Sequence, residues 1–253
     1  MMDIRSRHTI GMSPRSPDAG DVHAWYAPVS DLSVAGAIDA ALAWLTPAER
    51  ERYARFRADA DRHMFLLGRA MARVLVGRAL GIAPTAWQWR EGPHGRPEVA
   101  SPDTRLQFNI AHSAGLVACV VADGRDVGVD VEDRERRPVE WGVVQRHCGA
   151  DEILDISAQG GRWHDRFLYY WTLKEAYLKA LGLGIAAPLA RVCFRIDDDG
   201  PGIAFTSSLA NSDTRWQFRL ERPTDRHLMA VAVSTADGVE PAIHVQRLTE
   251  YLL

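Results

Sequence analysis

Two acids that could act together occur in one short, strand-like segment. Residues 127–132 read Val-Gly-Val-Asp-Val-Glu, and side chains alternate along a strand, so the valines share one face while Asp130 and Glu132 share the other. The two carboxylates then lie about 7 Å apart and can converge on one cation. The alternative is a strand with one solvated face, for which the same alternation is typical.

A second set of charges lies in an unusually apolar helix. From Phe167 to Leu181 the apolar side chains cover nearly the whole circumference, which is typical of a buried helix, yet the segment contains Lys174, Glu175 and Lys179. Burying an unpaired charge is costly, so these groups need partners. The alternative is an internal pair between Glu175 and Lys179, with Lys174 reaching solvent.

Together the two segments supply three carboxylates and two lysines. Oxygen ligands without a cysteine or histidine set suit a hard cation such as Mg²⁺, which binds one or two carboxylates together with phosphate oxygens of a substrate. The lysines would neutralise those phosphates, and this combination is typical of phosphoryl-type transfer. The sequence has no glycine-rich phosphate loop, no Gly-x-Ser-x-Gly elbow and no metalloprotease histidine spacing.

His112 is a third candidate. It lies at the end of a predicted strand and just before a turn that contains Gly115. An imidazole and backbone amides at such a turn can hold an anion. A histidine at the end of a strand can equally serve as a structural hydrogen-bond partner, and the sequence leaves both interpretations open.

The elements that position these residues follow the order strand, long helix, several strands, twice over. The segment Thr46–Glu49 predicts a helix start with a capping box, and we expect this long helix to end near Gly81, with an interruption at 57–61. A second long helix is predicted over 165–181 and should stop at Gly182. Strands are predicted at 22–29, 106–110, 116–122, 127–131, 192–196, 203–206, 216–220 and 228–233.

Composition and charge narrow the class of protein. The 253 residues carry a formal net charge of −3, which argues against a nucleic-acid-binding protein, because such proteins normally present a strongly basic face. The longest apolar run, 116–122, is far shorter than the roughly 20 residues that span a bilayer. Residues 1–20 lack the apolar core of a secretory signal, so we expect a disordered tail there. The three cysteines show neither disulfide nor zinc spacing, which indicates reduced thiols in a cytoplasmic protein.

Two motifs make the chain resemble the 4′-phosphopantetheinyl transferases of the Sfp type. These enzymes have a Gly-(Ile/Val)-Asp-x-Glu strand and, later in the chain, a Trp-x-x-Lys-Glu-(Ala/Ser)-x-x-Lys helix. The matching residues here are 128–132 and 171–179. Weaker matches occur at Phe108–Ser113, at Gly95–Pro97, at the Thr46-Pro47 helix start and at Glu152. The resemblance covers residues 22–253.

The resemblance implies an α+β fold (an α/β arrangement in the broad sense) of two similar halves related by a pseudo-twofold axis. Each half is a small, mainly antiparallel sheet packed against a long helix. We expect the halves at 21–133 and 134–253, after the tail at 1–20, with the active site in the cleft between them. The doubled order of elements agrees with this expectation.

The resemblance also implies an activity. Such enzymes take the phosphopantetheine arm from coenzyme A, attach it to a serine of an acyl, peptidyl or aryl carrier protein, and release adenosine 3′,5′-bisphosphate. Coenzyme A is then the co-substrate, and Mg²⁺, with Mn²⁺ as an alternative, is the metal. The carriers would belong to fatty acid, polyketide or nonribosomal peptide synthases, including those that make siderophores. We expect a monomer that engages neither nucleic acid nor a membrane.

Residue roles for the metal and the diphosphate carry over onto matching positions. The resemblance implies that Asp130, Glu132 and Glu175 hold the metal. It implies that Lys174 and Lys179 contact coenzyme A phosphates and that Lys179 also stabilises the leaving group. Glu175, directly or through a metal-bound water, would accept the proton of the serine.

Other matching positions concern the nucleotide. Arg96 and His112 match residues that grip the 3′-phosphate. Arg52 and Ala111 are further expected cofactor contacts, with Ala111 standing where a serine is common. Glu152 matches a recurrent acid of the family and is a further catalytic candidate.

One position departs from the family pattern. A basic residue is usual late in the first long helix, where this chain has Met64 and Phe65, and Arg62 or Arg69 would have to replace it. Two other functions stay open at this stage. One is a non-catalytic module of the same fold that binds coenzyme A or a carrier protein, and the other is a Mg²⁺-dependent hydrolase of a nucleotide diphosphate.

Overall fold

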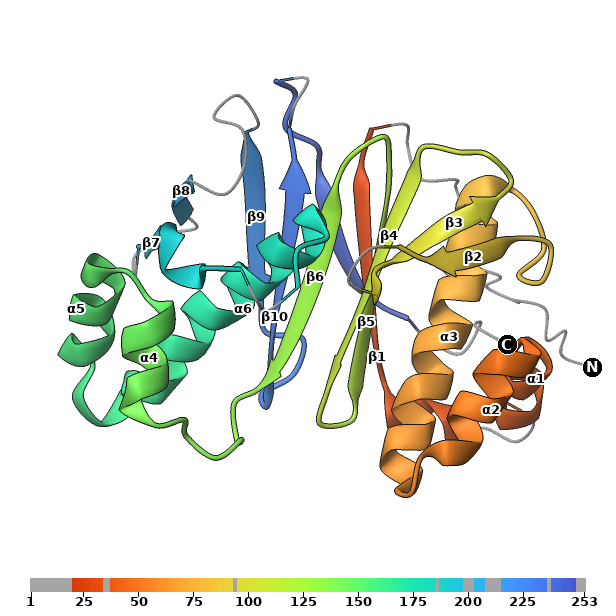
Figure 1. Cartoon of the computed structure of the whole chain (residues 1–253), viewed down its shortest axis with the longest axis horizontal. Coiled ribbons are helices and arrows are strands. Elements are labelled where there is room, and N and C mark those ends of the chain that lie inside the picture. Colours follow the sequence, from red (N-terminus) through yellow and green to blue (C-terminus); the bar gives the residue numbers. More distant parts are fainter. Residues whose placement is uncertain are drawn as a thin grey trace, which may run out of the picture.

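A computed structural model describes residues 20–33, 37–92, 95–184, 187–197, 203–207, 215–235 and 238–248. The tail expected over 1–20 lies outside these ranges except for its last residue. Figure 1 shows two lobes of mixed helix and strand, whose sheets lie side by side in the middle of the molecule. The fold is therefore α+β, as the sequence predicted.

A four-stranded sheet forms the first lobe, in the order β11-β1-β5-β4. Strands β1 and β11 are parallel, and the other neighbours are antiparallel. The long helix α3 (Asp59–Leu80) packs against one face of this sheet around Met71 and Leu75. The strands are β1 (Val22–Pro28), β4 (Leu106–Ser113), β5 (Leu116–Asp123) and β11 (Ile243–Arg247). Around them lie η1 (Val29–Ser33), α1 (Ala37–Ala43), α2 (Pro47–Arg55) and the hairpin of β2 (Gln88–Glu91) and β3 (Pro97–Ser101).

A three-stranded antiparallel sheet forms the second lobe, in the order β6-β10-β9. Helix α6 (Trp163–Leu181) covers the face of this sheet that is turned away from the first lobe (Figure 1). The strands are β6 (Val127–Asp133), β9 (Trp216–Glu221) and β10 (His227–Ser234). Around them lie α4 (Trp141–His147), α5 (Ala150–Ala158), η3 (Gly160–Arg162), η4 (Leu189–Arg191) and the hairpin of β7 (Val192–Ile196) and β8 (Ile203–Ser207).

Local signals set the ends of the long helices. Thr46 and Glu49 form the expected capping box, in which each backbone N–H is bonded by the other side chain. The chain then leaves the helix at Phe56 and re-enters it at Asp59, so the predicted interruption is confirmed. Gly81 and Gly182 follow α3 and α6 with φ of 69° and 67°, a left-handed conformation that glycine adopts without strain.

The two sheets pack against each other through a shared aliphatic core. Val127, Val129 and Val131 of β6 lie in this core with side chains of β1, β5 and β10. The opposite face of β6 is turned to α6, because a Cβ atom added at Gly128 would meet the backbone of that helix. The alternation seen in the sequence therefore separates two faces, as predicted, and the structure adds that the acidic face is turned to α6.

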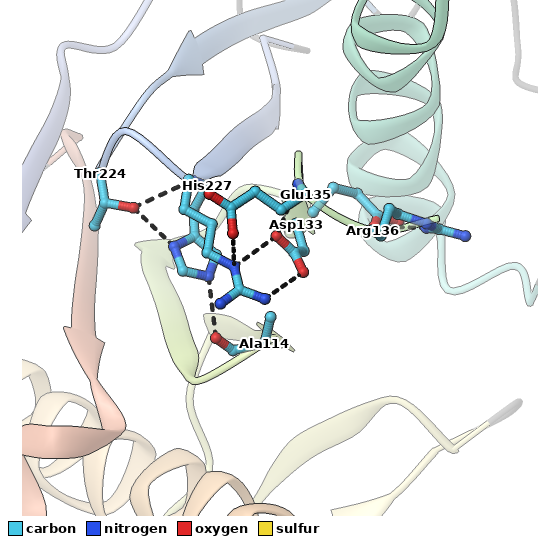
Figure 2. Close-up of polar contacts among 8 residues, drawn as sticks. Ala114, Asp133, Glu135, Arg136, Thr224 and His227 are labelled. Atoms are coloured by element: carbon cyan, nitrogen blue, oxygen red, sulfur yellow. Dashed lines mark hydrogen bonds and ion pairs between the residues drawn. The ribbon is translucent and has the colours of Figure 1, made fainter. Parts of the chain in front are cut away.

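Polar contacts also join the lobes. Asn109 Oδ1 on β4 accepts a hydrogen bond of 3.1 Å from the buried N–H of Val129 on β6. Figure 2 shows His227 between Thr224 and Ala114. The ring Nδ1 lies 2.7 Å from Thr224 Oγ1, and Nε2 lies 3.3 Å from the Ala114 carbonyl oxygen, in the turn between β4 and β5. Within the ranges described, no helix combines the length and apolarity that crossing a membrane requires.

Strand pairing crosses the division that we expected at residue 133. Strand β6 precedes this boundary but pairs with β10, while β11 follows it but pairs with β1. The division into halves at 21–133 and 134–253 stays a prediction. The two sheets do not coincide with it, because each contains a strand from the other side of residue 133.

Candidate functional site

A glycine allows β6 and α6 to approach closely enough to bring the acids together. A Cβ atom at Gly128 would lie 2.1 Å from the carbonyl oxygen of Ala176 and 2.5 Å from the nitrogen of Ala180. Only glycine fits this approach, because backbone atoms cannot move aside as a flexible side chain can. The face of β6 that carries Asp130 therefore lies directly against the face of α6 that carries Glu175.

The three predicted metal ligands meet at this contact. Asp130 and Glu175 are buried, with 6% and 7% of their surface exposed. Lys179 donates a hydrogen bond of 2.7 Å to Asp130 Oδ1, and Arg136 donates one of 2.7 Å to Glu132 Oε2. Two cationic side chains therefore hold two of the acids, and no lysine or arginine in the described part of the chain forms an ion pair with Glu175.

Crowding of negative charge changes how these acids ionise. Burial, and then the nearby charge of Asp130 and Glu132, raises the pKa of Glu175 to about 7, although Lys179 acts in the opposite direction. Burial and the charge of Asp130 also raise the pKa of Glu132. The site thus holds more acid than its own cations balance.

Two buried oxygens are available to a cation. Asp130 Oδ2 and Glu175 Oε1 have no hydrogen-bond partner in the described part of the chain. An all-oxygen donor set with unsatisfied buried carboxylates fits a hard cation such as Mg²⁺. The oxygens of the three acids do not all lie within 4.8 Å of one another, so at least one of the three side chains must rotate for all of them to bind one ion.

Lys174 and Glu152 lie elsewhere, in an ion pair of their own. Lys174 is fully buried, and its Nζ donates to Glu152 Oε2 at 2.5 Å and to the carbonyl oxygens of His147 and Leu189 at 2.8 and 3.2 Å. Since an ammonium group has three hydrogens, no donor is left for a phosphate. Glu152, 1% exposed, also accepts the N–H of Phe194. In this geometry both side chains are engaged with each other and with the backbone, and the roles in coenzyme A binding and catalysis that the resemblance implied stay predictions.

A pocket of about 290 Å³ lies between α3, the β2–β3 hairpin and β4. It contains two of the expected cofactor residues, Arg52 and His112. Partial burial and the positive charge of Lys179 lower the pKa of His112, which indicates that this imidazole and Lys179 share one region. The full lining is Arg52, Met64, Phe65, Gly68, Arg69, Trp89, Arg90, Glu91, Gly95, Pro97, Ile110 and His112.

The pocket shows how the chain departs from the family pattern. Met64 and Phe65 line it, and Arg69 is one of its three arginines, with its guanidinium 4.0 Å from the ring centre of Trp89 and its Nε 3.3 Å from Glu49 Oε1. Arg62 is instead bonded to the carbonyl oxygen of Phe56 and to Asp59. Trp89 and Arg90 were not assigned to the site from the sequence, although Trp87 and Trp89 alternate as side chains on one face of a strand do, which was a visible signal.

Two other expected contacts lie at the margins of the pocket. Arg96 donates to the carbonyl oxygen of Ala180 at 2.6 Å and to Gln107 at 3.3 Å, and burial lowers its pKa. It therefore ties the β2–β3 hairpin to the end of α6, while its neighbours Gly95 and Pro97 line the pocket. The methyl group of Ala111 lies in the core between the sheets and offers nothing to a ligand.

Comparison with known proteins identifies the family. Residues 33–124 match a family model described as "4′-phosphopantetheinyl transferase, N-terminal", and residues 126–232 match the "4′-phosphopantetheinyl transferase superfamily". The chain is 36% identical to a phosphopantetheinyl transferase of a Thraustochytrium species, over 90% of this chain and 84% of the relative. It is 30% identical to a 4′-phosphopantetheinyl transferase of Bacillus subtilis, over 66% of this chain and 73% of the relative.

A third relative comes from an animal. The chain is 26% identical to the mouse L-aminoadipate-semialdehyde dehydrogenase-phosphopantetheinyl transferase, over 77% of this chain and 68% of the relative. The chain belongs to the 4′-phosphopantetheinyl transferase superfamily. Membership does not favour a non-catalytic module or a nucleotide hydrolase.

Proposed function

We propose that this protein transfers the 4′-phosphopantetheine arm of coenzyme A to a serine of a carrier protein and releases adenosine 3′,5′-bisphosphate. The observation that carries the proposal is the meeting of Asp130, Glu132 and Glu175 beside Lys179, next to a basic pocket with an aromatic wall. The pocket suits an anionic nucleotide, since Arg52, Arg69 and His112 line it.

Asp130, Glu132 and Glu175 are the residues that would hold Mg²⁺. When bound, the ion neutralises the diphosphate of coenzyme A and makes its phosphorus more electrophilic. The support for this assignment is the donor set itself: three acids, two unsatisfied buried oxygens and a raised pKa at Glu175. Mn²⁺ fits the same oxygen ligands.

Glu175 and Lys179 are the proposed catalytic residues. Glu175, which faces the acids of β6, is the residue we propose to accept the hydroxyl proton of the serine, directly or through a metal-bound water. The serine oxygen then forms a bond to the phosphorus that carries the pantetheine arm, and the bond from that phosphorus to the oxygen of adenosine 3′,5′-bisphosphate breaks. Lys179 donates hydrogen bonds to the phosphate that leaves, in exchange for its present bond to Asp130.

The partners we propose are acidic carrier domains of fatty acid, polyketide or nonribosomal peptide synthases, siderophore synthases among them. Arginines are frequent along α2 and α3, and they complement both an acidic carrier and coenzyme A. We further propose a monomer that acts in the cytoplasm, where its three free cysteines stay reduced.

One assay tests the activity. The protein is incubated with an apo carrier protein, coenzyme A and Mg²⁺, and the carrier is then weighed by mass spectrometry. We expect the carrier to gain one phosphopantetheine, and we expect Asp130→Ala to lower the rate at least about 100-fold because a metal ligand is lost. The matched control is Asp123→Ala, an exposed acid at the end of β5, which should react like wild type. Unchanged mass with several carriers would reject the proposal, and release of free phosphopantetheine would indicate a hydrolase.

A further inference from the structure

A second group of ligand-type side chains lies at the edge of the four-stranded sheet. In the part of the chain that the structure describes, Asp21, His23 and His244 each offer one ligand atom, and these three atoms lie within 4.8 Å of one another. The proposed transferase mechanism uses none of them. They join the start of β1 to β11, which are separated by most of the chain.

Strand register explains why these residues meet. In the parallel β1–β11 pair, His23 lies directly beside His244, and their rings stack with centres 4.9 Å apart. Asp21 precedes His23 by two residues and so falls on the same side of the chain. Val22 and Ile243 point the other way, into the core between the sheets. His23 and His244 are thus held on two paired strands, and Asp21 lies immediately before β1.

The donor set has a definite chemical preference. Two imidazole nitrogens and one carboxylate oxygen suit Zn²⁺ and related divalent transition metals, whereas Mg²⁺ prefers oxygen ligands alone. Ligand atoms around tetrahedral zinc lie roughly 3.3 Å apart, given bonds of about 2.0–2.1 Å. Asp21 Oδ2 and His244 Nε2 are already 2.9 Å apart, and all three ligand atoms lie within 4.8 Å of one another, so side-chain rotations without a change of backbone can complete the set.

We propose that Asp21, His23 and His244 form a binding site for a divalent transition metal of the Zn²⁺ type, which fastens β11 to β1. The side chain of His244 is 43% exposed and that of Asp21 is 28% exposed, so an ion can enter from solvent and keep a water as a further ligand. Strand β11 is a five-residue edge strand, and a metal bridge would hold it to the sheet. The site is distinct from the acids on β6 and α6.

Cobalt binding tests this proposal directly. Co²⁺ is titrated into the tag-free full chain in an excess of Mg²⁺, with visible d–d absorption and equilibrium dialysis as readouts. We expect one equivalent that Mg²⁺ does not displace, and an affinity at least 10-fold weaker in His244→Gln. Saturating Zn²⁺ should raise the Tm of wild type by about 5 °C and should not raise that of His244→Gln.

Matched variants make the result decisive. His63→Gln changes a histidine on α3, outside the cluster, and should bind Co²⁺ like wild type. Asp130→Ala should also retain the cobalt spectrum, so a failure of the transferase proposal would leave this result untouched. If His244→Gln does not fold by circular dichroism, Asp21→Asn replaces it. The proposal would be overturned if the cluster variant and His63→Gln bound Co²⁺ equally well, or if wild type showed no d–d absorption. Asp21 and His244 would then form an ion pair only.

Discussion

Lys174 and Glu175 are adjacent in α6 but serve different parts of the molecule. Successive helical side chains point about 100° apart, so Lys174 faces Glu152 on α5 while Glu175 faces the acids of β6. A buried ion pair with every donor used is a positioning device, since removing either partner would leave an uncompensated charge. The pair fixes α5 against the helix that carries Glu175 and Lys179.

The raised pKa of Glu175 predicts how stability depends on pH. Because folding raises this pKa from 4.5 to about 7, the folded state holds more protons than the unfolded chain between these pH values. The free energy of unfolding should therefore fall as pH rises through this range in metal-free buffer. Glu175→Gln removes the effect, so the variant should be more stable than wild type by about 1–3 kcal/mol at pH 8 and by much less at pH 5.

Urea unfolding at pH 5 and pH 8 measures this difference. Added Mg²⁺ should restore the stability of wild type at pH 8, because a cation compensates the ionised acids, and it should have little effect on Glu175→Gln. The exposed acid variant Asp123→Ala serves as the control. A wild type that gains stability relative to Glu175→Gln as pH rises would contradict the assigned direction.

The sequence predicted that the charged side chains of α6 need partners, but it did not predict which residues these partners are. The apolar circumference of the helix correctly indicated that Lys174, Glu175 and Lys179 need partners. The local alternative, a pair between Glu175 and Lys179, does not form, because Lys179 bonds Asp130 on a distant strand. Helical spacing predicts only which side chains three or four residues apart on one helix can pair. It gives no information about pairs between a helix and a distant strand.

At the scale of elements, Gly128 sets the distance between β6 and α6. Gly128→Ala would place a methyl group 2.1 Å from the Ala176 carbonyl oxygen, and the helix would have to move. We expect a loss of more than about 3 kcal/mol in the free energy of unfolding and a loss of transfer activity, since the acids separate. Chemical denaturation and the carrier mass assay measure the two effects.

Gly68→Ala is the matched control for this prediction. A Cβ atom there would lie 3.3 Å from Cγ2 of Ile110, a side-chain atom that can shift, and alanine favours the helix. Its stability should stay within about 1 kcal/mol of wild type. Equal losses in the free energy of unfolding would show that the β6–α6 approach has no special role; the comparison concerns stability alone, because Gly68 lines the proposed nucleotide pocket.

Elements with strong local signals were predictable. The capping box at Thr46, the break before Asp59 and the left-handed glycines after α3 and α6 all act within a few residues. The basic pocket was only partly predictable. Arg52 and His112 line it, but so do Trp89 and Arg90, which reach it through the pairing of β2 with β3. Such a lining depends on how a hairpin lies against a helix.

At the scale of the whole molecule, strands from the two ends of the chain pair in the same sheet, and this joins the two lobes. Strand β6 pairs in the second sheet, and β11 returns from the end of the described chain to pair in the first. A boundary placed from element order at residue 133 could not anticipate this, because both pairings join residues far apart in sequence. The consequence is that neither sheet is complete without the other part of the chain.

Asn109 tests whether the lobes unfold together. Its side-chain oxygen accepts the buried N–H of Val129 across the gap between β4 and β6, and Asn109 is 5% exposed. Asn109→Ala leaves that N–H without a partner, so the free energy of unfolding should fall by about 1–3 kcal/mol. Because the aliphatic core between the sheets is shared, both lobes should lose this stability in one transition, with circular dichroism and tryptophan fluorescence giving the same urea midpoint.

Ser113→Ala, at the accessible end of the same strand, should change stability by less than about 0.5 kcal/mol. Separate midpoints for the two probes would mean that each lobe unfolds alone and that the contact between Asn109 and Val129 does not couple them.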